Sequence, residues 1–301
     1  MAATPSPAPK PQSPPLSPPP GSSSPGSPPP PASKDAREPS PESGNKLLYY
    51  WRRHIRPLVV LVAIFLSFRS IILDWNDVPT GSMRSTIIEG DRILVNKLAY
   101  GLKFPFTTWH LARWNTPARG EIVVFYSPED GIRLVKRVIG VPGDRIEIVG
   151  NRPKINGQWV KWEEAGADAL QPLPPEERSQ FKAFQETLGE HTHTVLVQDD
   201  EQVKRRIIRA GGDPRFYLNN PFRDVAEFVV PDGMYFVMGD NRDNSKDGRF
   251  YNRTSASTPF DPARSCVPVS QIVGRSSRTV FSLDLKDYWL PRKDRWFKAL
   301  P

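Results

Sequence analysis

A serine and a lysine, separated by about fifty residues, have the chemistry of a catalytic pair. Ser82 follows a glycine, where a tight turn could present its hydroxyl to a substrate. Lys136 lies in an alternating stretch whose positions on the same face of a strand are apolar: Ile132, Leu134 and Val138. Burial on that face would disfavour the ammonium and lower the lysine pKa. A neutral lysine can act as the general base for a serine nucleophile.

Each of these two residues also has an ordinary structural interpretation. A serine after a glycine is commonly a turn residue, and a strand lysine can extend its ammonium to water along its aliphatic stem. The two residues alone therefore do not establish a catalytic pair, and the sequence around them has to decide.

Four sequence blocks surround the pair in chain order. They are Val78-Pro79-Thr80-Gly81-Ser82-Met83 with Gly90 to Val95, Arg119 to Phe125, Leu134 to Asp144, and Gly239 to Arg249. In this order and spacing they resemble the type I signal peptidases, which are membrane-anchored serine proteases of the Ser-Lys class. The resemblance covers residues 78–250 and continues faintly through 267–274.

The resemblance implies a role for each matching residue. Ser82 would be the nucleophile and Lys136 its general base. The backbone N–H of Ser82 and the hydroxyl of Thr80 would form the oxyanion hole, because donors must lie about 3 Å from the developing charge. Ser245 would orient the lysine amine without adding a charge, and Asp247 with Arg249 would brace that loop.

By the same resemblance, five apolar residues would line shallow pockets for the small substrate side chains before the cleaved bond: Val78, Met83, Ile87, Val124 and Val135. The substrate would bind as an extended strand at a sheet edge. The chain departs from the family at two places. Glu121 stands where the family mostly has Asp, and an insertion, residues 252–265, follows Tyr251 close to the site.

The N-terminal part has the composition of a disordered tail. The first 45 residues contain 16 of the 34 prolines and no aromatic residue, in a chain of 301 residues and 34.0 kDa. Such a segment cannot bury enough apolar surface to offset its ordering entropy. Its Pro-rich runs would adopt polyproline II, which could also dock a partner of the SH3 type.

An apolar stretch from Pro57 to Leu73, interrupted by Arg69, predicts a transmembrane anchor. Its roughly 17 residues are at the lower limit for a spanning helix. Basic residues precede it and acidic residues follow it, so the positive-inside rule places the tail in the cytoplasm and the catalytic body outside the inner membrane. A cleaved secretory signal peptide is the alternative, but the position past residue 55 and the lack of a small-x-small site disfavour it.

The net charge of +8 does not indicate nucleic-acid binding, because no aromatic-interleaved basic stripe accompanies it. Attraction to anionic membrane lipid explains it better. The sequence predicts no cofactor and no metal. His191 and His193 alternate as half a metal site would, but no third ligand accompanies them, and we expect exposed loop histidines. The single cysteine, Cys266, allows no intramolecular disulfide.

After residue 78 the pattern is mostly β, with strands predicted at 92–95, 121–126, 133–139, 145–149 and 234–238. Pro142-Gly143-Asp144 predicts a type II turn. A helix over 174–188 and a strand over 193–198 are expected within an inserted segment. The fold predicted is mainly β: an antiparallel barrel-like catalytic core with an inserted smaller α+β cap, preceded by one transmembrane helix and a disordered tail.

The corresponding boundaries are 1–45 for the tail, 46–76 for the basic flank and anchor, 77–150 and 231–301 for the two parts of the core, and 151–230 for the cap. The function predicted is a membrane-anchored endopeptidase that removes signal peptides from exported preproteins. Two alternatives remain at this point. One is a self-cleaving protease of the LexA type, although the chain has an anchor and a Pro-rich tail in place of a DNA-binding domain. The other is a catalytically silent membrane scaffold.

Overall fold

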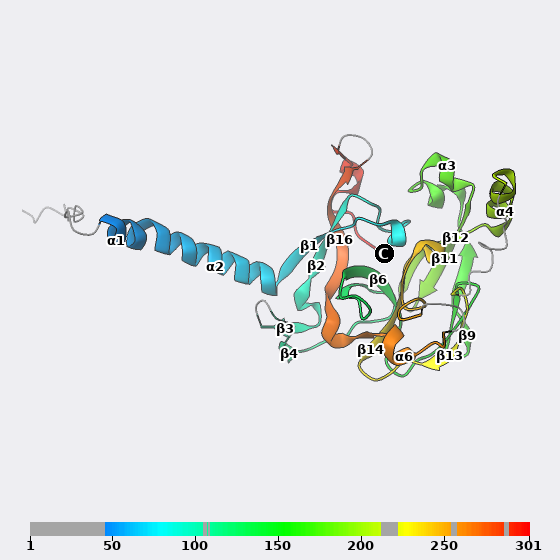
Figure 1. Cartoon of the computed structure of the whole chain (residues 1–301), viewed down its shortest axis with the longest axis horizontal. Helices are drawn as coiled ribbons and strands as arrows, with labels where there is room; N and C mark the ends of the chain where they lie inside the picture. Colours follow the sequence, from blue (N-terminus) through cyan, green and yellow to red (C-terminus); the bar gives the residue numbers. More distant parts are fainter. Residues whose placement is uncertain (1–45, 105–106, 108, 212–221, 254–257, 286–288) are drawn as a thin grey trace, which may run out of the picture. The chain divides into compact units, whose positions relative to one another are not determined.

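The computed structural model of the chain describes residues 46–104, 107, 109–211, 222–253, 258–285 and 289–301 (Figure 1). It divides into two units, residues 1–55 and 56–301. The first unit contains α1 (Lys46–Tyr50) and the π-helix η1 (Trp51–Ile55). The predicted disordered tail, residues 1–45, lies outside the described residues.

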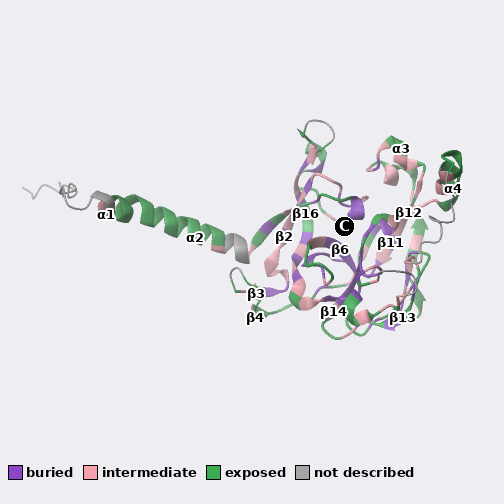
Figure 2. Ribbon diagram, in the orientation of Figure 1, coloured by how far each residue is buried: buried purple, intermediate pink, exposed green. Residues whose placement is uncertain are grey.

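The second unit begins with α2 (Arg56–Ile71), which occupies most of the predicted anchor. Its apolar side chains are exposed from Leu58 to Leu66 (Figure 2). Leu73, which the sequence interpretation counted in the anchor, instead begins the first strand. In the part of the chain that is described, none of the helices combines the length and the apolar character needed to cross a membrane.

One open antiparallel sheet of eight strands carries the core (Figure 1). In spatial order its strands are β1 (Leu73–Asp77), β2 (Asp91–Asn96), β16 (Ile272–Asp284), β5 (Ile122–Tyr126), β6 (Arg133–Gly140), β14 (Met234–Met238) and β15 (Val267–Pro268), with β17 (Leu290–Pro291) paired to β16. β16 shifts register against both β2 and β5. Such bulges bend a strand, and they help to curl the sheet into a half barrel. The prediction of a mainly β, antiparallel fold is confirmed.

Three smaller antiparallel sheets complete the unit. They are β13-β7-β8-β9 (Val225–Val229, Arg145–Val149, Arg152–Ile155, Gln158–Trp159), β10-β11-β12 (Lys161–Glu164, Phe181–Leu188, His191–Gln198) and β3-β4 (Gly101–Lys103, His110–Arg113). β8, which follows residue 150, pairs with β7, which precedes it, and β9 pairs with β8.

The predicted helix over residues 174–188 is wrong. Only α3 (Pro175–Arg178) is helical there, and β11 takes the second half of the segment. β11 pairs with β10 on one side and with β12 on the other. β12 pairs with β11 along its whole length, and β10 pairs with Phe184 to Thr187. This tertiary pairing overrides the helical preference of a segment that begins with two prolines and two glutamates. The strand predicted over 193–198 is confirmed as part of β12.

The other helices are short, and most are single turns. They are α4 (Asp200–Arg209), α6 (Pro262–Ser265), and the 3-10 turns η2 (Gly81–Met83), η3 (Lys97–Ala99), η4 (Ala167–Leu170), η5 (Arg242–Asn244), η6 (Val269–Gln271) and η7 (Lys293–Arg295). The type II turn predicted after β6 is confirmed. Gly143 has a φ of 85°, and the Asp144 N–H donates to the Val141 carbonyl at 3.0 Å.

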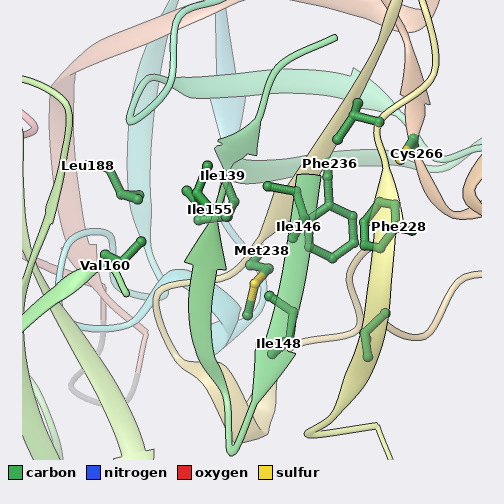
Figure 3. Close-up of a cluster of buried hydrophobic side chains, with 12 residues drawn as sticks. Ile139, Ile146, Ile148, Ile155, Val160, Leu188, Phe228, Phe236, Met238 and Cys266 are labelled. Atoms are coloured by element: carbon green, nitrogen blue, oxygen red, sulfur yellow. The ribbon is translucent and has the colours of Figure 1, made fainter. Parts of the chain in front are cut away.

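Apolar side chains pack on both faces of the sheet. Figure 3 shows the cluster formed by β6, β7, β13 and β14, in which Ile139, Ile146 and Phe236 are fully buried. Cys266 packs in the same cluster, and burial raises the pKa of its thiol to about 12. Ile132 is 58% exposed, so the prediction that it shares a buried face with Lys136 is wrong. It precedes the first residue of β6 and lies in the turn.

The aromatic centre of this cluster should dominate its stability. Phe236 is inaccessible to solvent and contacts the ring of Phe228 edge to face, with 5.2 Å between centroids. Phe236→Ala should lower the free energy of unfolding by about 3–5 kcal/mol, because it removes apolar contacts and leaves a cavity. Urea unfolding in detergent measures this loss. The matched control is Phe104→Ala, since Phe104 is 52% exposed. Equal losses in the two variants would contradict the packing described.

Candidate active site

The turn η2 holds Ser82 between β1 and β2. Gly81, Ser82 and Met83 are all buried, and 9% of Ser82 remains accessible. Thr80 precedes the turn in an extended conformation and is exposed. No hydrogen bond of the described residues uses the Ser82 backbone N–H, so this donor is available at the rim of the site.

Lys136 lies near the middle of β6, and only 2% of it is exposed. Its Nζ lies 2.6 Å from the Oγ of Ser82 and donates to the Val135 carbonyl at 3.2 Å. Burial lowers the pKa of this lysine from 10.5 to about 8, although the nearby carboxylates of Asp247 and Asp240 oppose the shift. At pH 7 a pKa of about 8 leaves roughly a tenth of the amines neutral, and this share rises steeply toward pH 9.

The segment after β14 fixes the position of the turn. Asn241 donates its backbone N–H to the Ser82 carbonyl at 3.0 Å and its side-chain amide to the Gly81 carbonyl at 3.0 Å. Gly239 packs so closely that an added Cβ would lie 2.4 Å from the Ser82 carbonyl oxygen. A side chain at residue 239 would therefore displace Ser82, and glycine is required here by close approach.

Asp247 and Arg249 stabilise the same loop through a buried ion pair. The guanidinium of Arg249 donates to both carboxylate oxygens of Asp247 at 2.8 Å, and the carboxylate also accepts the Gly239 N–H at 3.0 Å. Burial alone would raise the pKa of Asp247, but Arg249 holds it below its usual value. The carboxylate is therefore charged, and its charge is neutralised locally.

Ser245 is buried in this loop, and its hydroxyl lies near the Asp247 carboxylate, whose pKa it helps to lower. Its Oγ has no hydrogen bond of good geometry with any described residue. The Lys136 amine hydrogen-bonds Ser82 and Val135 in this structure. The orienting role implied for Ser245 stays a prediction.

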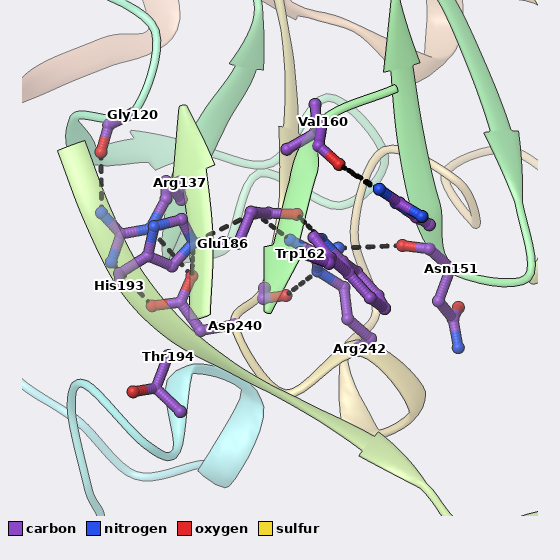
Figure 4. A network of polar contacts seen from close by, with 12 residues as sticks. Gly120, Arg137, Asn151, Val160, Trp162, Glu186, His193, Thr194, Asp240 and Arg242 are labelled. Carbon is purple, nitrogen blue, oxygen red and sulfur yellow. Dashed lines mark hydrogen bonds and ion pairs between the residues drawn. The ribbon is translucent and has the colours of Figure 1, made fainter. Parts of the chain in front are cut away.

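A second buried ion pair joins β6 to the same loop, as Figure 4 shows. Arg137 donates to the two carboxylate oxygens of Asp240 at 2.9 and 2.8 Å, and both side chains are almost fully buried. Thr86, three residues after the turn η2, donates to Asp240 at 2.6 Å. Burial would raise the pKa of Asp240, but Arg137 lowers it. The ion pair thus connects three segments of the site: β6, the loop after β14 and the segment after η2.

The inserted strands also reach this network, which the sequence interpretation missed. His193 lies on β12 with its Nε2 3.1 Å from Glu186 and 3.6 Å from Asp240, and it is completely buried. The expectation of exposed loop histidines is therefore wrong, because His191 and His193 belong to the strand β12, where His191 is half-buried and His193 is buried. Glu186 also pairs with Arg242 (Figure 4). Burial and the nearby Arg137 lower the pKa of His193, which keeps it neutral.

The five predicted pocket residues are brought together in one buried cluster beside the turn: Val78, Met83, Ile87, Val124 and Val135. Among the described residues, no group of three His, Cys, Asp or Glu side chains is placed to hold a metal ion.

Several residues of the site had no assigned role in the sequence interpretation. Three of them lie inside the sequence blocks: Asn241, Asp240 and Arg137. The block pattern drew attention to these positions, but it did not indicate which residues they contact. Thr86, Glu186 and His193 lie outside the blocks and carry no local signal. Only the folded arrangement of β12 beside the fourth block brings them to the site.

Comparisons with known proteins show what this chain is similar to. The family described as signal peptidase, peptidase S26, matches residues 51–281. Signal peptidase I of Pseudomonas aeruginosa is 33% identical over 78% of this chain and 74% of its own. Signal peptidase I of Buchnera aphidicola is 29% identical over 81% of this chain and 78% of its own. A crystal structure of a signal peptidase I from Enterococcus faecalis has a TM-score of 0.27 at 24% identity, covering 54% of this chain and 97% of that one, which is too low to inform the fold.

Burial of the Lys136 amine should cost stability in a pH-dependent way. Between pH 8 and 10.5 the unfolded chain binds more protons at this lysine than the folded one, so stability rises with pH in that window. Below it, the shift from 10.5 to about 8 corresponds to roughly 3 kcal/mol. Lys136→Met should therefore be more stable than the native chain at pH 7, by up to that amount, and the difference should vanish near pH 10.5.

Chemical unfolding at pH 7, 8.5 and 10 measures this difference, with the exposed Lys161→Met as the matched control. Equal stability of Lys136→Met and the native chain at pH 7, or a gain that grows with pH, would contradict the buried neutral amine.

Proposed function

The chain belongs to the signal peptidase family, peptidase S26, and we propose how its residues carry out the reaction. It is a serine endopeptidase that removes signal peptides. In our proposal Ser82 is the nucleophile and Lys136 is its general base. The observation that carries this proposal is the 2.6 Å separation of the Lys136 Nζ and the Ser82 Oγ in a site closed to bulk water. A general base must lie within hydrogen-bond reach of the proton that it abstracts.

In the acylation step, neutral Lys136 takes the hydroxyl proton while Ser82 Oγ bonds to the scissile carbonyl carbon. The oxyanion of the tetrahedral intermediate accepts hydrogen bonds from the Ser82 N–H and the Thr80 hydroxyl. Two observations support these donors: the N–H is unused by the described residues, and Thr80 stands exposed immediately before the turn.

The protonated lysine then gives its proton to the leaving amine as the peptide bond breaks. Water, deprotonated by the same lysine, attacks the acyl carbon, and Ser82 recovers its proton when the acyl-enzyme is hydrolysed. The cycle needs a lysine that changes protonation easily, and a pKa of about 8 meets this need.

We assign positioning roles to three further residues. Ser245 approaches the lysine amine when substrate is bound and fixes its rotamer. Asp247 and Arg249 hold the loop that carries Ser245, and their mutual neutralisation prevents the carboxylate from keeping Lys136 protonated.

The signal peptide binds in extended form beside the turn, with small side chains before the cleaved bond in contact with the apolar cluster of Val78, Met83, Ile87, Val124 and Val135. The clustering of these residues next to Ser82 supports the assignment, because shallow apolar surface favours small aliphatic groups.

The enzyme works at a membrane, in our proposal, with its N-terminal tail in the cytoplasm and the catalytic unit on the outer side of the inner membrane. The apolar side chains of α2 are exposed from Leu58 to Leu66, and Arg52, Arg53 and Arg56 precede them. An exposed apolar helix with a basic flank is stabilised by lipid with that orientation. Membrane lipid and the signal peptides of preproteins are its expected partners.

The proposed role of Ser82 can be tested by mutation. The detergent-solubilised chain should cleave a preprotein after an Ala-x-Ala site, and Ser82→Ala should reduce the rate by about 10³-fold or more. Gel analysis with mass spectrometry of the mature N-terminus measures both. The matched control is Ser277→Ala, an exposed serine on β16, which should cleave normally. Cleavage by Ser82→Ala at the native rate would exclude Ser82 as nucleophile.

The second prediction concerns the base. Because Lys136 must be neutral to act, kcat/KM should rise about tenfold from pH 7 to pH 9 around a pKa of about 8. Lys136→Arg should be inactive across this range, since guanidinium does not deprotonate. Lys154→Arg, a change on a surface ion pair, is the control. A flat pH profile, or an active Lys136→Arg, would mean that another group is the base.

A further inference from the structure

A second concave site lies away from Ser82 and Lys136. It is a cavity of about 610 Å³ between the β3–β4 hairpin, the turn residues Pro142 and Gly233, and the strands β14 and β16. Neither member of the proposed catalytic pair lines it. Its size lies in the range of cavities that bind small molecules.

The cavity is lined by cations and by no described acidic residue. Lys97, Lys103, His110 and Arg113 all face it. Lys97 pairs with Asp74 outside the cavity at 3.3 Å. Neither Lys103 nor Arg113 forms an ion pair with any residue of the described part of the chain. Two positive charges therefore meet here without a carboxylate to balance them.

The concentration of positive charge in the cavity affects the pKa of Lys103. Its ammonium donates to the Ile272 carbonyl and is largely buried in the cavity wall. Burial, together with the positive charges of Lys97 and Arg113, lowers its pKa from 10.5 to about 8. An anion in the cavity would supply the missing negative charge and raise this pKa again.

The other residues that line the cavity indicate which kind of anion it fits. Arg113 offers a planar fork that matches a phosphate group, and Lys103 offers a point charge. Tyr100, Trp114 and Ile272 supply aromatic and apolar surface beside these cations. A bare inorganic ion would leave that surface unused, whereas an organic phosphate would contact both.

We propose that this cavity binds a phosphate group carried by an organic molecule, with Lys103 and Arg113 as its principal ligands. The phosphate could belong to a phospholipid headgroup or to a soluble phosphate ester. The same hairpin exposes 77% of Trp109 and 61% of Leu111, and such residues are frequent where proteins meet a lipid interface. The headgroup is therefore the source that the surface favours.

The test is calorimetric titration of the full chain in detergent with three probes: dihexanoylphosphatidic acid, glycerol phosphate and dihexanoylglycerol, which lacks the phosphate. The phosphatidic acid should bind, and dihexanoylglycerol should not. Much tighter binding of phosphatidic acid than of glycerol phosphate identifies a lipid headgroup, and equal binding identifies a soluble ester.

The variant Lys103→Gln with Arg113→Gln should weaken phosphatidic acid binding by at least about tenfold, since it removes two charge-assisted contacts. Lys161→Gln with Lys182→Gln removes the same charge from exposed strands elsewhere and is the matched control. Arg113→Gln alone changes an exposed residue, so the fold is preserved, and it should show a smaller loss. Preprotein cleavage in excess detergent verifies folding.

Three results would overturn the proposal. They are no binding of either phosphate probe, equal binding of dihexanoylglycerol and phosphatidic acid, and equal loss of affinity in the cavity variant and in the charge-matched control.

Discussion

The exclusion of water from the Lys136 amine is the condition on which the rest of the site depends. Two carboxylates, Asp240 and Asp247, lie close enough to favour the ammonium. Each is bound by its own buried arginine, Arg137 or Arg249, which neutralises it where it stands. The two ion pairs therefore do more than support the loop. They allow acidic residues to organise the backbone around Ser82 without raising again the lysine pKa that burial has lowered.

The same ion pairs connect the catalytic core to the inserted strands. Asp240 accepts hydrogen bonds from Arg137 and Thr86 through its side chain, and its carbonyl accepts the Leu196 N–H of β12 at 2.8 Å. Ser85, three residues after Ser82, donates to the carbonyl of Thr194 on the same strand. The inserted segment therefore packs against the segment that carries Ser82, and its integrity is coupled to the geometry of the site.

The sequence predicted the parts of this molecule that local patterns determine. The strand predicted over 133–139 is β6, and the turn at Gly143 has the residues that its backbone requires. The β11 strand was mistaken for a helix because its pairing with β10 and β12 is set by contacts distant in sequence. His193 was misplaced for the same reason, since its partners Glu186 and Asp240 come from other segments. Residue types and local sequence predicted the pair Ser82 and Lys136. Only the tertiary structure could reveal the side chains that hold these two residues in place.

The burial of Cys266 has a practical consequence for work on this protein. It is the single cysteine of the chain, and its high pKa leaves almost no thiolate to react with maleimides or iodoacetamide at neutral pH. A cysteine introduced at an exposed position can therefore carry a fluorophore or spin label in an otherwise native sequence. Distances between labels placed on the inserted strands and on the β3–β4 hairpin then become measurable in lipid.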